Sequence, residues 1–147
     1  MKAQKWLARV KGTVDPFNRL SEAWRGFNNL FFPVRATNER EKIKSFLLSK
    51  TSANDASALM GMYKREIAYL LSKPVVDMRG NGNDTSDNIA AYHSTTDPVR
   101  RVVELFMIIY QVRCNLEHGQ KAPDTPRDAE LCAYSSSIVA RVVELYA

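Results

Sequence analysis

Residues 98–119 read PVRRVVELFMIIYQVRCNLEHG. Apolar side chains recur in this stretch at steps of three or four, the spacing that places them on one face of a helix. They are Val99, Val102, Phe106 and Ile109. The next step of the pattern falls on Arg113, and a permanently charged group on an apolar stripe is costly unless it has a partner or a function. The stretch therefore predicts a long core helix ending near His118, with Arg113 as a candidate functional residue.

Start and stop signals divide the rest of the chain into further helices. Asp15-Pro16 and Asn38 are typical helix starts, whereas Pro74 marks a helix end. The expected helices span residues 16–32, 39–50, 55–73, 98–118 and 127–146, with one more helical turn at 89–92. The first of them carries an aromatic stripe that we assign to the core, formed by Phe17, Leu20, Trp24, Phe27 and Phe31. Because no strand pattern or repeat is evident, the sequence predicts an all-α fold, a bundle of four or five helices.

Length and composition are those of one ordinary globular domain over residues 1–147, with 45% hydrophobic and 25% charged residues. No apolar run is long enough to span a bilayer, and the basic start of the chain lacks the apolar segment of a secretory signal. We therefore expect a cytoplasmic protein with no membrane partner. Cys114 and Cys132 are too few for a disulfide framework or a zinc site, so we expect reduced thiols, no metal and no cofactor.

The chain carries a formal net charge of +5 and has a pI of about 9.3. This excess of positive charge favours a polyanionic partner, although a charge that only maintains solubility is an equally good interpretation. Part of the excess lies at the start of the chain, in Lys2, Lys5, Arg9 and Lys11. Two interpretations stay open for this cluster: a solvated face, or a surface that follows an RNA backbone.

Arg113 and His118 together suggest chemistry on a phosphodiester. Arginine binds phosphate through a planar fork of donors, and histidine transfers protons near neutral pH. On one unbroken helix, however, residues five apart point about 140° away from each other. Either the helix ends between Arg113 and His118, or a second chain completes the site. A two-fold dimer that pairs the 98–118 helices would place two arginines and two histidines around one cleft.

The run from Ile109 to Lys121, IYQVRCNLEHGQK, resembles the HEPN superfamily. The motif of that family is an arginine, four to six residues and then a histidine, at the end of one helix and before the next. The resemblance implies a HEPN-like helical bundle that acts as a dimer and cleaves RNA without a metal. Such domains occur in toxin–antitoxin, abortive-infection and antiviral systems, so an antitoxin or a defence protein is an expected partner.

The resemblance also assigns roles to individual residues. His118 would act as general acid or base while the RNA 2′-hydroxyl attacks the adjacent phosphate. Arg113 would stabilise the charged phosphorane and orient the strand. Asn115 would hold the strand or position His118, and Lys121 would contact a phosphate.

Two positions depart from the family pattern, Cys114 and Glu117. Glu117 lies one helical turn after Arg113, where the two can form an i,i+4 ion pair that competes with phosphate. Glu117 therefore favours an alternative function, a non-catalytic HEPN-like module that binds RNA, a nucleotide or a partner protein. In a third interpretation the chain is a helical dimerisation module, Arg113 is a structural partner of Glu117 and His118 caps the helix.

Overall fold

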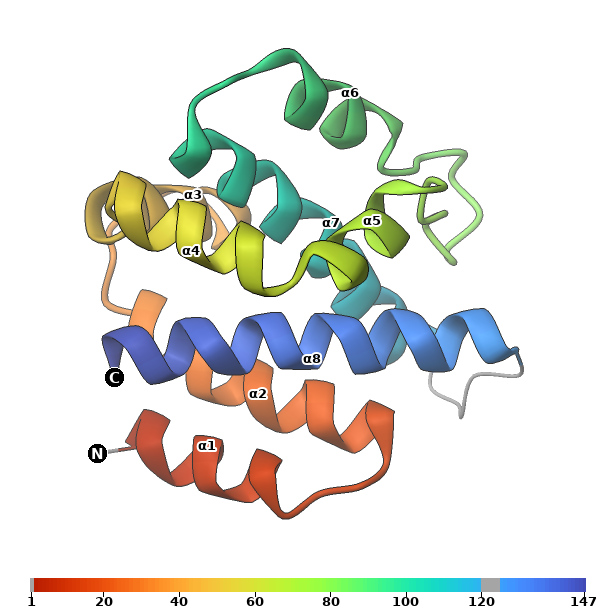
Figure 1. Cartoon of the computed structure of the whole chain (residues 1–147). Helices are drawn as coiled ribbons and strands as arrows, with labels where there is room; N and C mark the ends of the chain where they lie inside the picture. Colours follow the sequence, from red (N-terminus) through yellow and green to blue (C-terminus); the bar gives the residue numbers. More distant parts are fainter. Residues whose placement is uncertain (1, 120–124) are drawn as a thin grey trace.

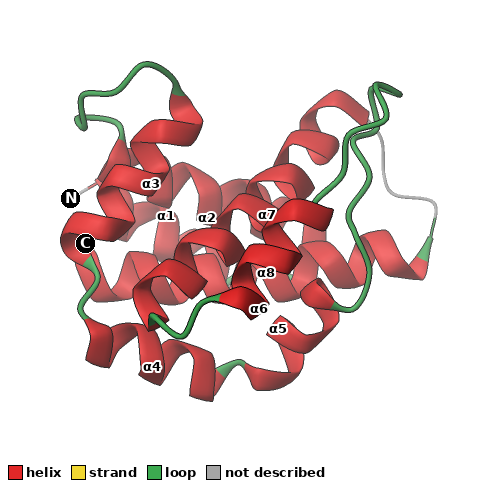
Figure 2. Ribbon diagram, turned by 90° about the horizontal axis from the view of Figure 1, so that it is seen from above, coloured by secondary structure: helices red, strands yellow, loops and turns green. Residues whose placement is uncertain are grey.

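The computed structural model describes residues 2–119 and 125–147, with the side chains of residues 118 and 119 left out. Within these ranges the chain forms eight helices and no strand (Figures 1 and 2). They are α1 (Lys2–Lys11), α2 (Pro16–Phe31), α3 (Glu39–Lys50), α4 (Ala53–Met62), α5 (Lys64–Leu71), α6 (Ser86–Ser94), α7 (Pro98–Gly119) and α8 (Pro126–Tyr146). The predicted all-α class is confirmed, but the expected number of four or five helices was too low.

Local capping explains why most predicted helix starts are correct. The Asp15 carboxylate accepts a hydrogen bond from the backbone N–H of Phe17 at 3.0 Å, directly before Pro16 opens α2. The Asn38 side chain accepts from the N–H of Glu41 at 2.9 Å in the same way and starts α3. Such caps satisfy donors that the first helical turn leaves free, and they depend only on neighbouring residues.

Three additional elements account for the difference in helix number. The expected helix over 55–73 is two helices, α4 and α5, because Tyr63 between them leaves the helical conformation at φ −116° and ψ 35°. The helix α1 was not predicted, because its lysines and arginines were considered only as charge. Its apolar residues Ala3, Leu7 and Val10 do follow helical spacing, and Ala3 and Val10 are buried in the structure. The turn expected at 89–92 is the longer helix α6.

The helix α7 runs through the middle of the molecule and packs against α3, α4 and α6 (Figure 2). On its other side lies a layer in which α2 contacts both α1 and α8 (Figure 1). As a result, every residue from Leu105 to Ile109 is buried, not only the predicted stripe. The first turn and the last turns of α7 are partly open, and the last turns carry Arg113.

The aromatic stripe of α2 forms the centre of the core, as predicted. Phe27 is fully buried, and its ring centroid lies between 5.0 and 5.9 Å from those of four other aromatic rings. These rings belong to Trp24, Phe31, Phe46 and Phe106. Phe17 is the one stripe residue that is only partly buried. No helix in the described ranges is long and apolar enough to span a membrane.

Candidate functional site

Arg113 lies in the open end of α7, with its side chain 20% exposed and held on three sides. Its Nη2 is 2.8 Å from Oε1 of Glu117, one turn later in the same helix. Its Nη1 is 3.7 Å from Oε1 of Glu39, in the first turn of α3. The guanidinium carbon also lies 5.6 Å from the centre of the Trp24 ring, within the range of a cation–π contact. The predicted pairing of Arg113 with Glu117 is therefore confirmed, whereas Glu39 and Trp24 were not predicted as its neighbours.

The backbone of α7 is helical through Gly119, so the helix does not end between Arg113 and His118. Positions five apart lie about 140° apart around a helix axis, so Arg113 and His118 belong to different faces of α7. The His118 side chain and the whole of Lys121 lie outside the described residues.

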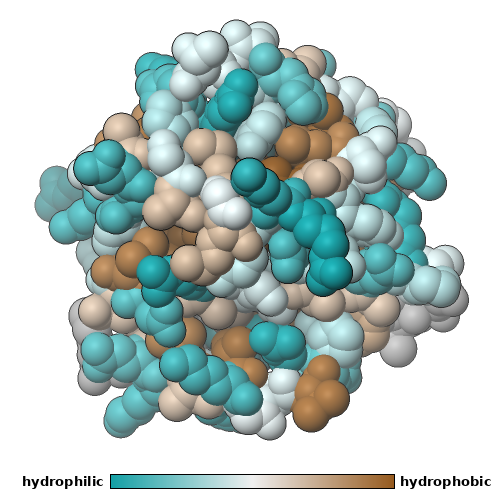
Figure 3. Space-filling view, viewed as in Figure 1, coloured by the Kyte–Doolittle hydropathy of each residue, from teal (hydrophilic) through white to brown (hydrophobic). Residues whose placement is uncertain are grey.

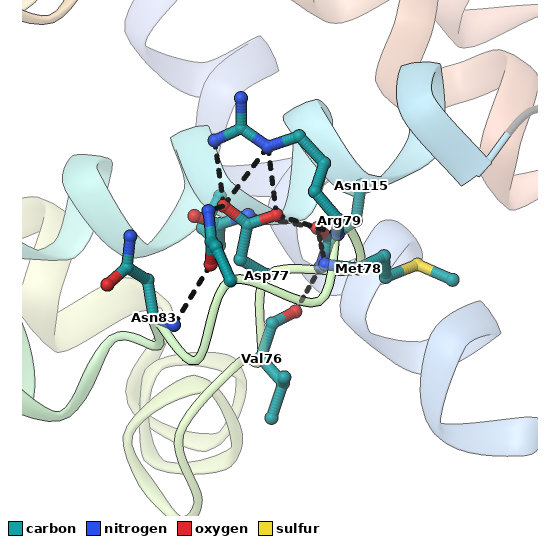
Figure 4. A network of polar contacts seen from close by, with 8 residues as sticks. Val76, Asp77, Met78, Arg79, Asn83 and Asn115 are labelled. Carbon is teal, nitrogen blue, oxygen red and sulfur yellow. Dashed lines mark hydrogen bonds and ion pairs between the residues drawn. The ribbon is translucent and has the colours of Figure 1, made fainter.

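Asn115, on α7, forms hydrogen bonds with the backbone of the loop between α5 and α6 (Figure 4). Its Oδ1 accepts hydrogen bonds from the backbone N–H of Met78 at 3.0 Å and from the Gln111 side chain at 2.9 Å. Its Nδ2 donates to the carbonyl of Val76 at 2.8 Å. The resemblance assigns Asn115 to the RNA strand or to the positioning of His118, but in the structure its amide makes three hydrogen bonds to protein groups. Asn115 thus positions a loop beside the candidate site.

The same loop contains a second ion pair, between buried Asp77 and Arg79 (Figure 4). Nη2 of Arg79 is 2.8 Å from Oδ2 of Asp77, and the Asn81 amide donates to the same oxygen at 3.0 Å. Hydrogen bonds from Arg79 hold the pKa of the Asp77 carboxyl well below its ordinary value. The loop therefore depends on the charge of one carboxylate.

We expect this dependence to appear as a pH effect on stability. Because the folded pKa of Asp77 is depressed, its contribution is complete above its ordinary pKa of about 3.9 and is lost as the pH falls toward the folded value. The difference in melting temperature between the parent and Asp77→Asn should therefore shrink between pH 5 and pH 2.5. Thermal melts at both pH values measure this, and a constant difference would contradict the assigned role.

Tyr110 and Cys114 form the surface of α7 next to Arg113. Burial, with Cys114 and Glu39 nearby, raises the pKa of Tyr110 to about 12. Burial also raises the pKa of the Cys114 thiol, although a hydrogen bond from Tyr110 and the charge of Arg113 oppose this effect. Both groups stay protonated at neutral pH, so Cys114 is not an activated nucleophile.

The charges around this end of α7 are nearly balanced. Arg113 faces two carboxylates, Arg79 faces Asp77, and Arg40 lies over the Tyr110 ring with its guanidinium carbon 5.1 Å from the ring centre. A phosphate would have to displace a carboxylate from Arg113. Glu117 is the easier one to displace, because its side chain is 56% exposed and that of Glu39 only 32%.

Among the residues that the structure describes, no three His, Cys, Asp or Glu side chains are placed to hold a metal ion. The site contains one guanidinium group that can bind an anion, that of Arg113. His118 follows in the next turn of α7. The chain matches no family model, no curated protein and no solved structure. The interpretation of this site therefore depends on its own chemistry.

Proposed function

We propose that the chain is a HEPN-like domain that cleaves RNA without a metal, with Arg113 and His118 acting at a cleft between two copies. The observation that carries the proposal is the position of Arg113. Its guanidinium is partly exposed at the end of the helix that bears His118, and a displaceable carboxylate occupies the place that a phosphate would take. A cytoplasmic toxin or defence protein with a cognate inhibitor is the setting that we propose for this activity.

In the proposed reaction the RNA 2′-oxygen forms a bond to the adjacent phosphorus while the bond from phosphorus to the 5′-oxygen breaks. One His118 removes the proton of the 2′-hydroxyl, and the His118 of the second copy protonates the leaving 5′-oxygen. Arg113 stabilises the charge that develops on the non-bridging oxygens. The products are a 2′,3′-cyclic phosphate and a 5′-hydroxyl, and the reaction needs no co-reactant.

The continuity of α7 supports the need for a second copy. Because Arg113 and His118 diverge on one helix, a histidine from another protomer is the simplest way to complete the site. Because the middle of α7 is buried, a pairing that includes Arg113 and His118 would involve its last turns, about residues 111–119. A dimer formed there would bring both arginines and both histidines close to the two-fold axis.

The ion pair between Arg113 and Glu117 favours a second candidate, a non-catalytic module that binds RNA, a nucleotide or a partner protein. At 2.8 Å, with Glu39 behind it, Glu117 makes Arg113 a poorer ligand for phosphate. In this case the fold and the dimer would persist without cleavage.

Incubation of the purified protein with total RNA in EDTA tests the proposal. Cleavage products that end in a 2′,3′-cyclic phosphate and a 5′-hydroxyl would support the metal-independent nuclease. Intact RNA after incubation with a folded, dimeric protein would reject it in favour of the binding module. Cleavage that EDTA abolishes would contradict both.

We expect Glu117→Gln to strengthen RNA binding about two- to fivefold at low salt. The substitution keeps the shape of the side chain but removes the charge that competes with phosphate. An ion pair near the surface is worth about 0.4–1 kcal/mol. Fluorescence anisotropy with a labelled oligonucleotide measures the change. Glu41→Gln is the matched control, because Glu41 also forms an exposed ion pair within one helix, with Lys44. An equal gain in both variants would mean that only net charge matters.

A further inference from the structure

A groove of about 570 Å³ lies on the side of α1 that faces α2, away from α7. Cationic, aromatic and amide side chains line it, namely Lys2, Lys5, Trp6, Arg9 and Asn29. In the view of Figure 3, hydrophilic side chains cover much of the lower left of the molecule, where Figure 1 places α1. The groove has no part in the site at the end of α7.

Trp6 is the aromatic residue that lines this groove. The guanidinium carbon of Arg9 lies 5.1 Å from the ring centre, and that of Arg25, on α2, lies 5.0 Å from it. The ring is held in place because α1 approaches α2 closely at Gly26. A Cβ on Gly26 would lie only 3.3 Å from the Cβ of Trp6. Nucleobases stack on guanidinium planes and on aromatic rings, so a base can replace one of these guanidinium groups on the Trp6 ring.

Positive charge dominates the groove. Three cations line it, Lys2, Lys5 and Arg9, and a fourth, Arg25, lies at the Trp6 ring; the one carboxylate in an ion pair with them is Glu22, 3.5 Å from Arg9. Within the described part of the chain, the other three cations have no carboxylate partner. This excess of charge differs from the balanced site around Arg113 and leaves donors free for phosphates.

We propose that the groove between α1 and α2 binds single-stranded RNA, with bases on Trp6 and phosphates on Lys5 and Arg25. The inference rests on the proposed function, in which RNA is the target. It adds a second RNA-binding surface to the site around Arg113. An anionic membrane is a poorer partner, because a helix that lies in a bilayer surface presents apolar residues outward. In α1 the apolar residues Ala3 and Val10 are buried against the protein instead.

The test uses a fluorescein-labelled 12-nucleotide oligouridine with 2′-O-methyl groups. This probe lacks the 2′-hydroxyl nucleophile, so its binding is measured separately from cleavage. Each phosphate contact contributes about 0.7 to the slope of log K against log salt, and this contribution vanishes near 1 M salt. At 0.1 M salt, the double variant Lys5→Gln/Arg25→Gln should therefore bind about 25-fold more weakly. The slope itself should fall by about 1.4. Lys50→Gln/Arg100→Gln, which removes the same charge from other exposed positions, should bind like the parent.

Tryptophan fluorescence locates the bound strand independently of charge. The chain has two tryptophans, of which Trp24 is only 2% exposed and Trp6 lies in the groove. Unlabelled oligonucleotide should therefore quench the emission of the parent. In Trp6→Phe, which keeps an aromatic ring in place, the quenching should disappear while the affinity stays within about twofold.

Three results would overturn the inference. One is unchanged affinity and salt slope in the groove double variant. Another is quenching that persists in Trp6→Phe. The third is groove-dependent binding to phosphatidylserine vesicles or to polyglutamate with no binding of the oligonucleotide. Failure of the proposed nuclease is distinguishable, because the groove would still bind the probe in a protein that leaves RNA intact. The converse result is unchanged RNA binding in the variants of the groove, together with cleavage that still depends on His118. That result would reject the role of the groove and leave the proposed nuclease intact.

Discussion

His118→Ala is expected to slow RNA cleavage by about 10²–10⁴-fold, the usual contribution of a general acid or base. The proposed reaction needs a group that takes and returns a proton near neutral pH, and imidazole is the side chain suited to this. The measurement is the rate at which 2′,3′-cyclic phosphate ends appear in EDTA. Because His118 lies in the last turn of α7, beyond the buried middle of that helix, the fold should survive the substitution.

The chain contains a matched control for this experiment. Its one other histidine, His93, is exposed on α6. His93→Ala makes the same chemical change and should leave the rate unchanged. Arg113→Ala should lose cleavage as His118→Ala does, because the charge of the phosphorane would then be uncompensated. If His118→Ala cleaved as fast as the parent, the assignment of His118 to the reaction would fail.

Phe27→Ala should lower the free energy of unfolding by about 3–5 kcal/mol, the range for removing a buried aromatic side chain. Phe27 is fully buried, and four aromatic rings from α2, α3 and α7 surround it. The cavity left by alanine would lie where these three helices meet, and rigid rings cannot close it easily. Urea unfolding followed by far-UV circular dichroism measures the loss. Since domains of this size are stable by about 5–15 kcal/mol, the variant should be close to unfolding.

Phe32→Ala is the control for the core prediction. Phe32 is 66% exposed at the end of α2, so the same substitution should change the free energy of unfolding by no more than about 0.5 kcal/mol. Equal losses in the two variants would contradict the view that the aromatic cluster carries the stability of this domain. A changed slope against urea, rather than a changed midpoint, would instead indicate an altered unfolded state.

The sequence was a good guide where the cause is local. Helix caps such as Asp15 and Asn38 act on residues within one turn, and the aromatic stripe of α2 follows directly from helical spacing. The ion pair of Arg113 with Glu117 was predictable for the same reason, because its partners are four residues apart on one helix. All of these features survive however the helices are arranged around each other.

Tertiary packing decided the features that single-sequence patterns missed. The helix α1, half of whose residues are basic or polar, packs on α2 and α8, while Tyr63 breaks a stretch whose apolar spacing is continuous. Helix propensity is a weak preference that such contacts override. Tertiary packing also brings Arg9 and Arg25, which come from two different helices, to the Trp6 ring.

The sequence by itself determined an all-α chain, its main helix starts, its aromatic core and the Arg113–Glu117 pair. Only the tertiary structure placed Glu39 and Trp24 next to Arg113. It also formed the hydrogen bonds between Asn115 and the 76–78 backbone, and it buried the middle of α7. The physical reason is the range of the interactions. Caps, stripes and i,i+4 pairs depend on backbone geometry within one or two turns, whereas the surroundings of a side chain depend on which distant helices pack against it.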